Sequence, residues 1–153
     1  MDMEELYNKI YRYCYFKLYD KQLAQDITQE TFLRFFQQNA SINIRKELPY
    51  LYTIAKNLCA DNFRKKSVEN LENITEETMY NPTDDWINNL TLKSILSKLP
   101  PEEQELIFLR YVNEISINTI CKITGVSRFA IHRRLSKVIK WLKDELKKEG
   151  FSE

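Results

Sequence analysis

The chain of 153 residues is poor in the residues that break helices and build tight turns. It contains two glycines and four prolines. Because β-hairpins depend on turn residues, this scarcity predicts an almost entirely helical protein. The chain also lacks any run of the roughly 20 apolar residues that a membrane span needs. The acidic start, Met1–Glu5, has none of the basic residues that open a signal peptide. We therefore expect a cytoplasmic protein without a membrane span.

Cysteine and histidine are too few and too scattered for a disulfide framework or a metal site. Cys14, Cys59 and Cys121 lie far apart and never in CxxC spacing, so we expect small, buried apolar side chains in a reducing compartment. The single histidine, His132, has no carboxylate near it in the sequence, and the chain has no glycine-rich phosphate loop. Catalysis or metal binding needs such partners. The sequence therefore predicts neither an enzyme nor a bound metal or cofactor.

Acidic residues are also missing from one long stretch. Between Ile115 and Lys143 the chain carries seven Lys and Arg residues and no Asp or Glu, although the net charge of the whole protein is only +1. A plainly solvated helix normally mixes both signs and gains ion pairs between residues i and i+4. A stretch that forgoes these pairs is typical of a surface that binds an anionic partner.

The same stretch has the pattern of a helix-turn-helix. Ser116 is placed to cap a short helix that ends near Ile123, and Ser127 is placed to cap the next one. Gly125 between them can adopt the left-handed conformation that a tight turn requires. The spacing predicts a buried stripe in the second helix: Ile131, Leu135, Val138, Leu142 and Leu146. The residues rotated away from it face outward: Phe129, Arg133, Ser136, Lys137 and Lys140. A short turn followed by a basic exposed helix is how many proteins enter the DNA major groove, where an exposed phenylalanine can contact a thymine methyl group or a sugar.

Charge divides the chain into three parts. Residues 1–66 hold 11 Lys and Arg against 8 Asp and Glu, residues 67–105 hold 2 against 9, and residues 106–153 hold 10 against 5. The segment 67–83 is acidic and aperiodic, which indicates a flexible linker. The predicted fold is therefore all-α, with one small helical domain at 1–66 and a second, containing the helix-turn-helix, at 84–153.

The N-terminal part predicts three helices, over Met3–Tyr19, Gln22–Gln38 and Pro49–Lys66. Pro49 is placed at the start of the third helix, where its missing N–H costs nothing. In the second helix the pattern predicts an apolar side: Ala24, Ile27, Thr31, Phe32, Phe35 and Phe36. Its other side is polar but includes one leucine: Asp26, Gln29, Glu30, Leu33 and Gln37. Such a face suits docking of a partner, and plain solvation is the alternative.

Several motifs resemble those of a known family. Gln25–Arg34 (QDITQETFLR) resembles the signature helix of bacterial RNA polymerase sigma factors of the sigma-70 superfamily. Leu51–Asp61 (LYTIAKNLCAD) is similar to the helix that follows in the two-domain extracytoplasmic-function (ECF) group. Leu99–Glu105 (LPPEEQE) with Leu109–Tyr111 resembles the opening of that group's second domain, and the stretch from Gly125 to Lys137 resembles its recognition helix.

The resemblance implies a transcription initiation factor that binds core RNA polymerase and promoter DNA. It implies that Asp26, Gln29, Glu30 and Leu33 dock on the β′ clamp coiled coil, and that residues 106–111 contact the β-flap. The melted −10 element would be captured by the loop 38–47 and the following helix, through Asn43, Lys56, Asn57 and Arg64. The −35 element would be bound by the recognition helix, through Arg128, Phe129, His132, Arg133, Ser136, Lys137 and Lys140. An anti-sigma factor is a further partner that this family suggests.

The chain departs from the family at two of the DNA-reading positions. Arg133 stands where a small residue is usual, and Phe129 replaces a frequent glycine, so the −35 sequence does not carry over by analogy. Two alternatives remain open at this stage. One is a helix-turn-helix regulator that binds DNA without polymerase, and the other is an adaptor that binds polymerase without melting DNA. The low net charge favours a protein that depends on polymerase for its DNA affinity.

Overall fold

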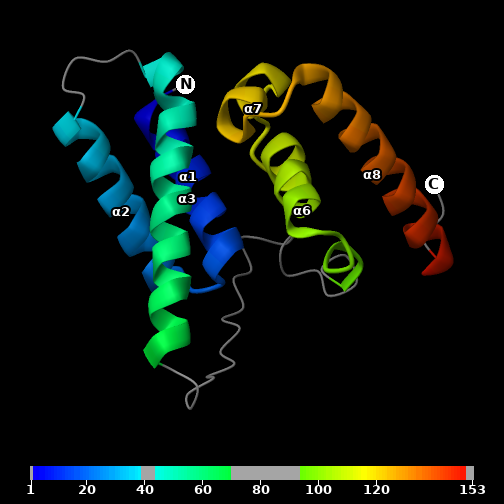
Figure 1. Ribbon diagram of the computed structural model, residues 1–153, viewed down its shortest axis with the longest axis horizontal. Helices are drawn as coiled ribbons and strands as arrows, with labels where there is room; N and C mark the ends of the chain where they lie inside the picture. Colours follow the sequence, from blue (N-terminus) through cyan, green and yellow to red (C-terminus); the bar gives the residue numbers. More distant parts are fainter. Residues whose placement is uncertain (1, 39–43, 70–93, 151–153) are drawn as a thin grey trace. The chain divides into compact units, whose positions relative to one another are not determined.

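The structure is a computed structural model, and it describes residues 2–38, 44–69 and 94–150. All regular secondary structure in these residues is helical (Figure 1). The chain divides into two compact units, Met1–Met79 and Tyr80–Glu153. The all-α, two-domain prediction is therefore confirmed. No helix in the described part of the chain is long and apolar enough to cross a membrane.

The first unit is a bundle of three mutually packed helices (Figure 1), α1 (Met3–Leu18), α2 (Lys21–Gln38) and α3 (Ile44–Glu69). Asp2 caps α1, and its side chain accepts a hydrogen bond from the backbone N–H of Glu5 at 2.8 Å. The buried core is rich in aromatic side chains: Leu6, Ile10, Tyr13, Cys14, Tyr15, Ala24, Ile27, Phe32, Phe35, Leu48, Leu51, Tyr52, Ala55 and Cys59. The rings of Tyr13 and Tyr52 meet edge to face at 5.2 Å, which joins α1 to α3.

Polar groups in this core are satisfied locally. The hydroxyl groups of Thr28 and Thr31 each donate to a backbone carbonyl one turn earlier, at 2.7 Å. The thiols of Cys14 and Cys59 are buried in contact, and the hydrogen bond from Cys59 holds the pKa of Cys14 below its ordinary value. Cys121 is only half-buried. Two of the three cysteines therefore behave as the sequence predicted.

The third helix starts earlier than predicted and runs slightly beyond the predicted end near Lys66. The helix begins at Ile44, so Pro49 lies inside it and not at its start, and it continues to Glu69. A proline in this position removes one backbone hydrogen bond. The turn before it persists because Leu48 is buried in the core, and packing of this kind outweighs local propensity. The first three residues of the predicted linker are helical, and the rest of that segment lies outside the described residues.

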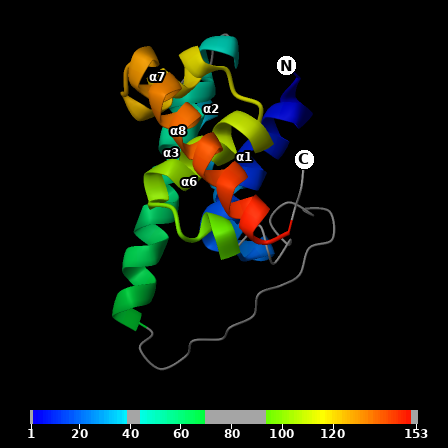
Figure 2. The same cartoon turned by 90° about the vertical axis from the view of Figure 1, so that its right-hand side faces the viewer.

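The second unit contains α6 (Pro101–Ile107), the π-helical turn η1 (Phe108–Val112), α7 (Ile117–Thr124) and α8 (Arg128–Lys148). α6 packs against α8, as does α7 (Figure 2). The helix-turn-helix follows its sequence pattern closely. Ser116 and Ser127 accept hydrogen bonds from the backbone N–H groups of Thr119 and Ala130, each at 3.2 Å. Four residues of the predicted stripe of α8 are buried and Leu146 is half-buried, which fixes the rotation of this helix about its axis.

Gly125 ends α7 in the left-handed conformation, with φ at 74° and its N–H bonded to the carbonyl of Cys121. A Cβ atom added there would meet nothing within 4 Å, so only backbone strain opposes a side chain. We expect Gly125→Ala to lower the free energy of unfolding by about 1–2 kcal/mol, and Gly125→Asn to lower it by less. Urea denaturation measures both. Gly150→Ala is the matched control, because that glycine also has positive φ and open space but lies at the end of α8, where fraying relieves strain. Equal losses at the two glycines would contradict this account.

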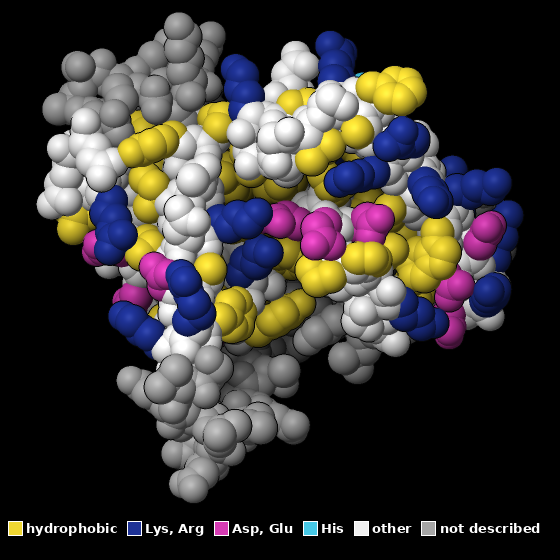
Figure 3. Space-filling view, in the orientation of Figure 1, with side chains coloured by type: hydrophobic (Ala, Val, Ile, Leu, Met, Phe, Trp, Pro, Cys, Tyr) yellow, Lys and Arg dark blue, Asp and Glu magenta, His cyan; other side chains and the backbone are white. Residues whose placement is uncertain are grey.

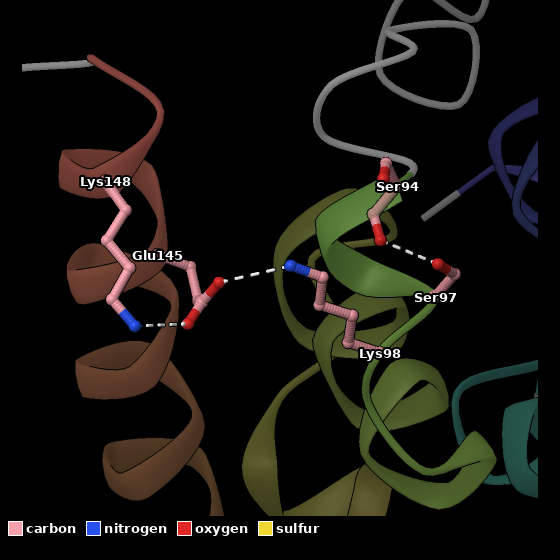
Figure 4. Close-up of polar contacts among 5 residues, drawn as sticks. All are labelled: Ser94, Ser97, Lys98, Glu145 and Lys148. Atoms are coloured by element: carbon pink, nitrogen blue, oxygen red, sulfur yellow. Dashed lines mark hydrogen bonds and ion pairs between the residues drawn. The ribbon is translucent and has the colours of Figure 1, made fainter.

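A small network of charged groups joins the start of this unit to the last turns of α8 (Figure 4). The carboxylate of Glu145 accepts from the ammonium groups of Lys148 at 3.3 Å and Lys98 at 3.4 Å. The hydroxyl of Ser97 donates to the carbonyl of Ser94 in the turn that carries Lys98, which helps to hold that turn. The hydrogen bond from Lys148, followed by that from Lys98, holds the pKa of Glu145 below its ordinary value despite partial burial.

This depressed pKa gives a pH dependence of stability with a definite sign. Glu145 releases its proton more readily in the folded chain than in the unfolded chain. Its ionised carboxylate therefore adds to the free energy of unfolding above the ordinary glutamate pKa, and this contribution is lost as the pH falls through the pKa of the folded chain. We expect Glu145→Gln to lower the urea midpoint at neutral pH and to make progressively less difference in acid. Glu149→Gln, near the exposed end of the same helix, is the control. If Glu145→Gln has the same urea midpoint as the wild type at neutral pH, this network does not stabilise the fold.

Candidate nucleic-acid interface

Every residue predicted to bind the −35 element is exposed on α8: Arg128, Phe129, His132, Arg133, Ser136, Lys137 and Lys140. In Figure 3, Lys and Arg side chains gather over the upper part of α8, whereas carboxylates appear only towards its C-terminal end. Ser127 starts the helix and the buried stripe orients it, so the turn chemistry and the core together direct these side chains to solvent. The face can supply hydrogen-bond donors to base edges and cations to phosphates.

Two residues of this face contact each other. The guanidinium of Arg133 lies over the ring of Phe129, 5.8 Å from its centroid. Phe129 is 74% exposed, so this ring does not belong to the core. Sequence reasoning placed both residues outward but did not pair them, although their spacing of i, i+4 is the one at which helical side chains meet.

Beside this face lies a groove of about 550 Å³ formed by η1, α7 and α8. Its lining is basic and apolar, without a carboxylate: Arg110, Tyr111, Ile117, His132, Leu135, Ser136, Ile139, Lys140 and Lys143. The π-helical turn brings Arg110 into the wall, where its guanidinium also donates to the carbonyl of Ile115 at 3.1 Å. Arg110 and Lys143 are candidate phosphate ligands that sequence reasoning did not single out. For Arg110 the reason is that a π turn changes side-chain direction in a way that the 3.6-residue pattern does not show.

The stretch predicted to contact the β-flap is mostly core. Leu106, Ile107, Phe108 and Leu109 are buried, and Phe108 and Leu109 are wholly inaccessible. Only Tyr111, at 53% exposure, offers a large accessible surface. The resemblance alone placed a β-flap contact on this stretch. Packing of the second unit buries these four side chains and leaves them little surface for such a contact, so it stays a prediction for Tyr111.

The predicted polymerase-docking residues share one exposed face of α2. Asp26, Gln29 and Leu33 are exposed and Glu30 is half-exposed. Leu33 has 53% of its surface accessible and lies near the centre of the face. Asp26 accepts from Gln22 at 3.1 Å, and Glu30 forms an ion pair with Arg34 at 2.9 Å. The carboxylates are therefore held in place by neighbours one turn away on the same helix.

Phe36 was predicted to belong to the core side of α2, and the structure contradicts this. It is 47% exposed, and its ring packs edge to face on that of Phe35 at 5.4 Å. Because Phe36 follows Leu33 by three residues, it lies on the border of the polar face. The apolar part of this face is therefore larger than the sequence suggested.

The residues predicted to bind the −10 element are only partly described. Lys56, Asn57 and Arg64 are exposed on α3, and Asn57 and Arg64 lie two turns apart on one side. Arg64 is paired with Asp61. Asn43 lies outside the described residues together with the rest of 39–43, whereas the last four residues of the predicted loop, 44–47, form the first turn of α3. No group of three or more His, Cys, Asp or Glu residues that could hold a metal ion occurs in the described part of the chain.

Comparisons with known proteins agree with this division of the chain. Residues 3–68 match the family model of Sigma-70 region 2, and residues 90–142 match that of Sigma-70 region 4. The chain is 32% identical over 165 residues to the ECF RNA polymerase sigma factor SigW of Bacillus subtilis, with coverage of 94% of this chain and 88% of SigW. The chain belongs to the ECF sigma factors. It is accordingly a promoter-specific transcription initiation factor that acts with RNA polymerase.

A second ECF sigma factor, BldN of Streptomyces coelicolor, is 32% identical over 133 residues. The match covers 80% of this chain, which spans half the length of BldN. Among solved structures the chain is similar to one described as the RsbN–BldN complex, at 24% identity and a TM-score of 0.34, with coverage of 90% of this chain and 83% of that one. A structural likeness at this score adds no support to the family assignment, which rests on the sequences.

Proposed function

We propose that this ECF sigma factor docks on core polymerase through α2 and reads the −35 element through α8. The observation that carries the proposal is the exposed face of α8. This face follows the turn capped by Ser127 and presents basic side chains, and the helix has no carboxylate before Asp144. A surface of this kind binds duplex DNA by phosphate contacts and base-edge hydrogen bonds together.

In this proposal the α2 face meets the β′ clamp coiled coil. This assignment is supported by the composition of the face, on which exposed Leu33 and half-exposed Phe36 are surrounded by carboxylates and amides. An apolar centre with a polar rim is typical of a protein–protein interface. Asp26, Gln29, Glu30 and Leu33 are the predicted contacts, and we add Phe36. For the β-flap, Tyr111 is the remaining candidate.

The −10 element is assigned to α3. Exposed Lys56, Asn57 and Arg64 offer two cations and an amide to a melted strand, and a flipped base needs such hydrogen-bond partners to offset its unstacking. In the second unit, Arg110 and Lys143 of the groove are proposed to contact phosphates beside the −35 bases, where they would position the helix and leave its sequence preference unchanged.

Run-off transcription tests the proposal. Core RNA polymerase, the purified chain and a library of promoter templates are expected to give transcripts whose start sites share one −35 and one −10 sequence. The alternative regulator would retain specific duplex binding without polymerase and would start no transcript. An adaptor would bind polymerase but open no promoter, which permanganate footprinting of unpaired thymines would reveal.

A further inference from the structure

Phe129 is the most exposed large hydrophobic side chain of the described residues, with 74% of its surface accessible. An apolar ring in water brings no packing energy to the fold, so the core does not account for it. It is the second residue of α8, on the side directed away from the buried stripe. A ring in this position is available either to a bound partner or to a neighbouring side chain.

The neighbouring side chain that uses it is Arg133. Its guanidinium lies over the Phe129 ring, 5.8 Å from the centroid, one helical turn further along. Among the described residues no carboxylate forms an ion pair with Arg133, and the sequence has none between Ile115 and Lys143. The ring is thus the group that orients this arginine.

This kind of contact leaves the arginine chemically available. An aromatic ring attracts a cation through its face, whereas a carboxylate would occupy the N–H donors that read a base. Holding the side chain before DNA arrives also reduces the rotamer freedom that binding would otherwise remove. An arginine prepared in this way suits the paired acceptors O6 and N7 of guanine.

We propose that Phe129 is a positioning residue for Arg133, and that the pair together selects a guanine at one position of the −35 element. The inference rests on the proposed DNA-reading role of α8. It changes the expected role of Phe129, whose main contribution is to orient the arginine and not to contact a thymine methyl group.

A double-mutant cycle on the holoenzyme tests the pair. Holoenzyme reconstituted from core polymerase and the full chain is titrated with duplexes that carry each of the four bases at each −35 position. We expect Arg133→Ala to remove the guanine preference at one position, and Phe129→Leu to reduce the same preference about two- to fivefold. In the Arg133→Ala background Phe129→Leu should have no further effect on that preference. Phe129→Tyr, made in the otherwise wild-type chain, should retain the preference because tyrosine also offers a ring face.

Arg134→Ala is the matched control, since Arg134 is also exposed and adjacent in sequence but lies about 100° away around the helix. In that background Phe129→Leu should keep its full effect. A second readout uses the free protein, in which the ring-current shift of the Arg133 side-chain protons should disappear in Phe129→Leu.

Two outcomes would overturn the inference while leaving the proposed function intact. One is independent, additive effects of the two substitutions, and the other is a loss in Phe129→Leu that is equal on every duplex. A wild-type holoenzyme without any −35 base preference would instead overturn the proposed function of α8, and the inference with it.

Discussion

A chain that carries Glu30→Arg together with Gln29→Ala is expected to lose binding to core RNA polymerase while its helical content stays unchanged. Both residues lie on the face of α2 that the core of the first unit does not use. The carboxylate of Glu30 is accessible, and its i,i+4 ion pair with Arg34 at 2.9 Å orients it without burying it. Reversal of a charge within an interface typically costs about 2–5 kcal/mol, which corresponds to roughly 30-fold to several-thousand-fold weaker binding.

The measurement is direct binding of labelled chain to core polymerase, with circular dichroism to check the fold. Glu4→Arg with Asn8→Ala is the matched control, because it makes the same charge reversal and likewise replaces a side-chain amide by alanine, at exposed positions of α1. This control should bind as the wild type does. Retention of wild-type affinity by the Glu30 and Gln29 variant would show that this face is solvated and not a docking surface. An equal loss in the control would indicate a general charge effect.

The helix-turn-helix was predictable from sequence because its determinants are local. Ser116, Gly125 and Ser127 act within one turn of their own positions, and each adopts the conformation that its chemistry favours. Spacing alone gave the buried stripe of α8. Once caps and stripe are fixed, the outward directions of Arg133 and Lys140 follow.

The errors concern residues whose environment depends on distant parts of the chain. Pro49 lies inside α3 because Leu48 is buried against the other helices, which no local rule reveals. The exposure of Phe36 depends on how closely α2 packs against α1 and α3. The spacing of apolar residues gives only an approximate border between the buried and the exposed face of a helix. Arg110 reached the groove wall through a π turn, a feature without a sequence signature.

The contact between Phe129 and Arg133 is an intermediate case. Its spacing was visible in the sequence, but exposed side chains at i and i+4 often point apart. The structure brings the guanidinium over the ring, and the sequence between Ile115 and Lys143 holds no Asp or Glu that would compete for it. The exposed ring and the arginine one turn further along α8 are thus a physical pair.

The second large effect that we expect separates base reading from phosphate binding along α8. Arg133 lies in the second turn of the helix, and Lys140 lies two turns further along nearly the same side. If the N-terminal part of α8 enters the major groove, Arg133 meets base edges, whereas Lys140 lies where the helix leaves the groove and meets the backbone. Loss of an arginine–guanine pair should cost about 1–3 kcal/mol at one base position.

Arg133→Ala should therefore relax the preference of the holoenzyme at one −35 position, whereas Lys140→Ala should weaken all duplexes alike and lower the salt dependence of binding by about one unit of slope. Affinity measured across a panel of −35 variants at several salt concentrations distinguishes the two. Lys147→Ala, exposed near the end of the same helix, controls for a general loss of charge and should change neither quantity. Identical behaviour of Arg133→Ala and Lys140→Ala across the panel would mean that α8 does not enter the groove by its N-terminal turns. The two residues would then both contact the backbone, and sequence preference would have to arise from another part of the chain.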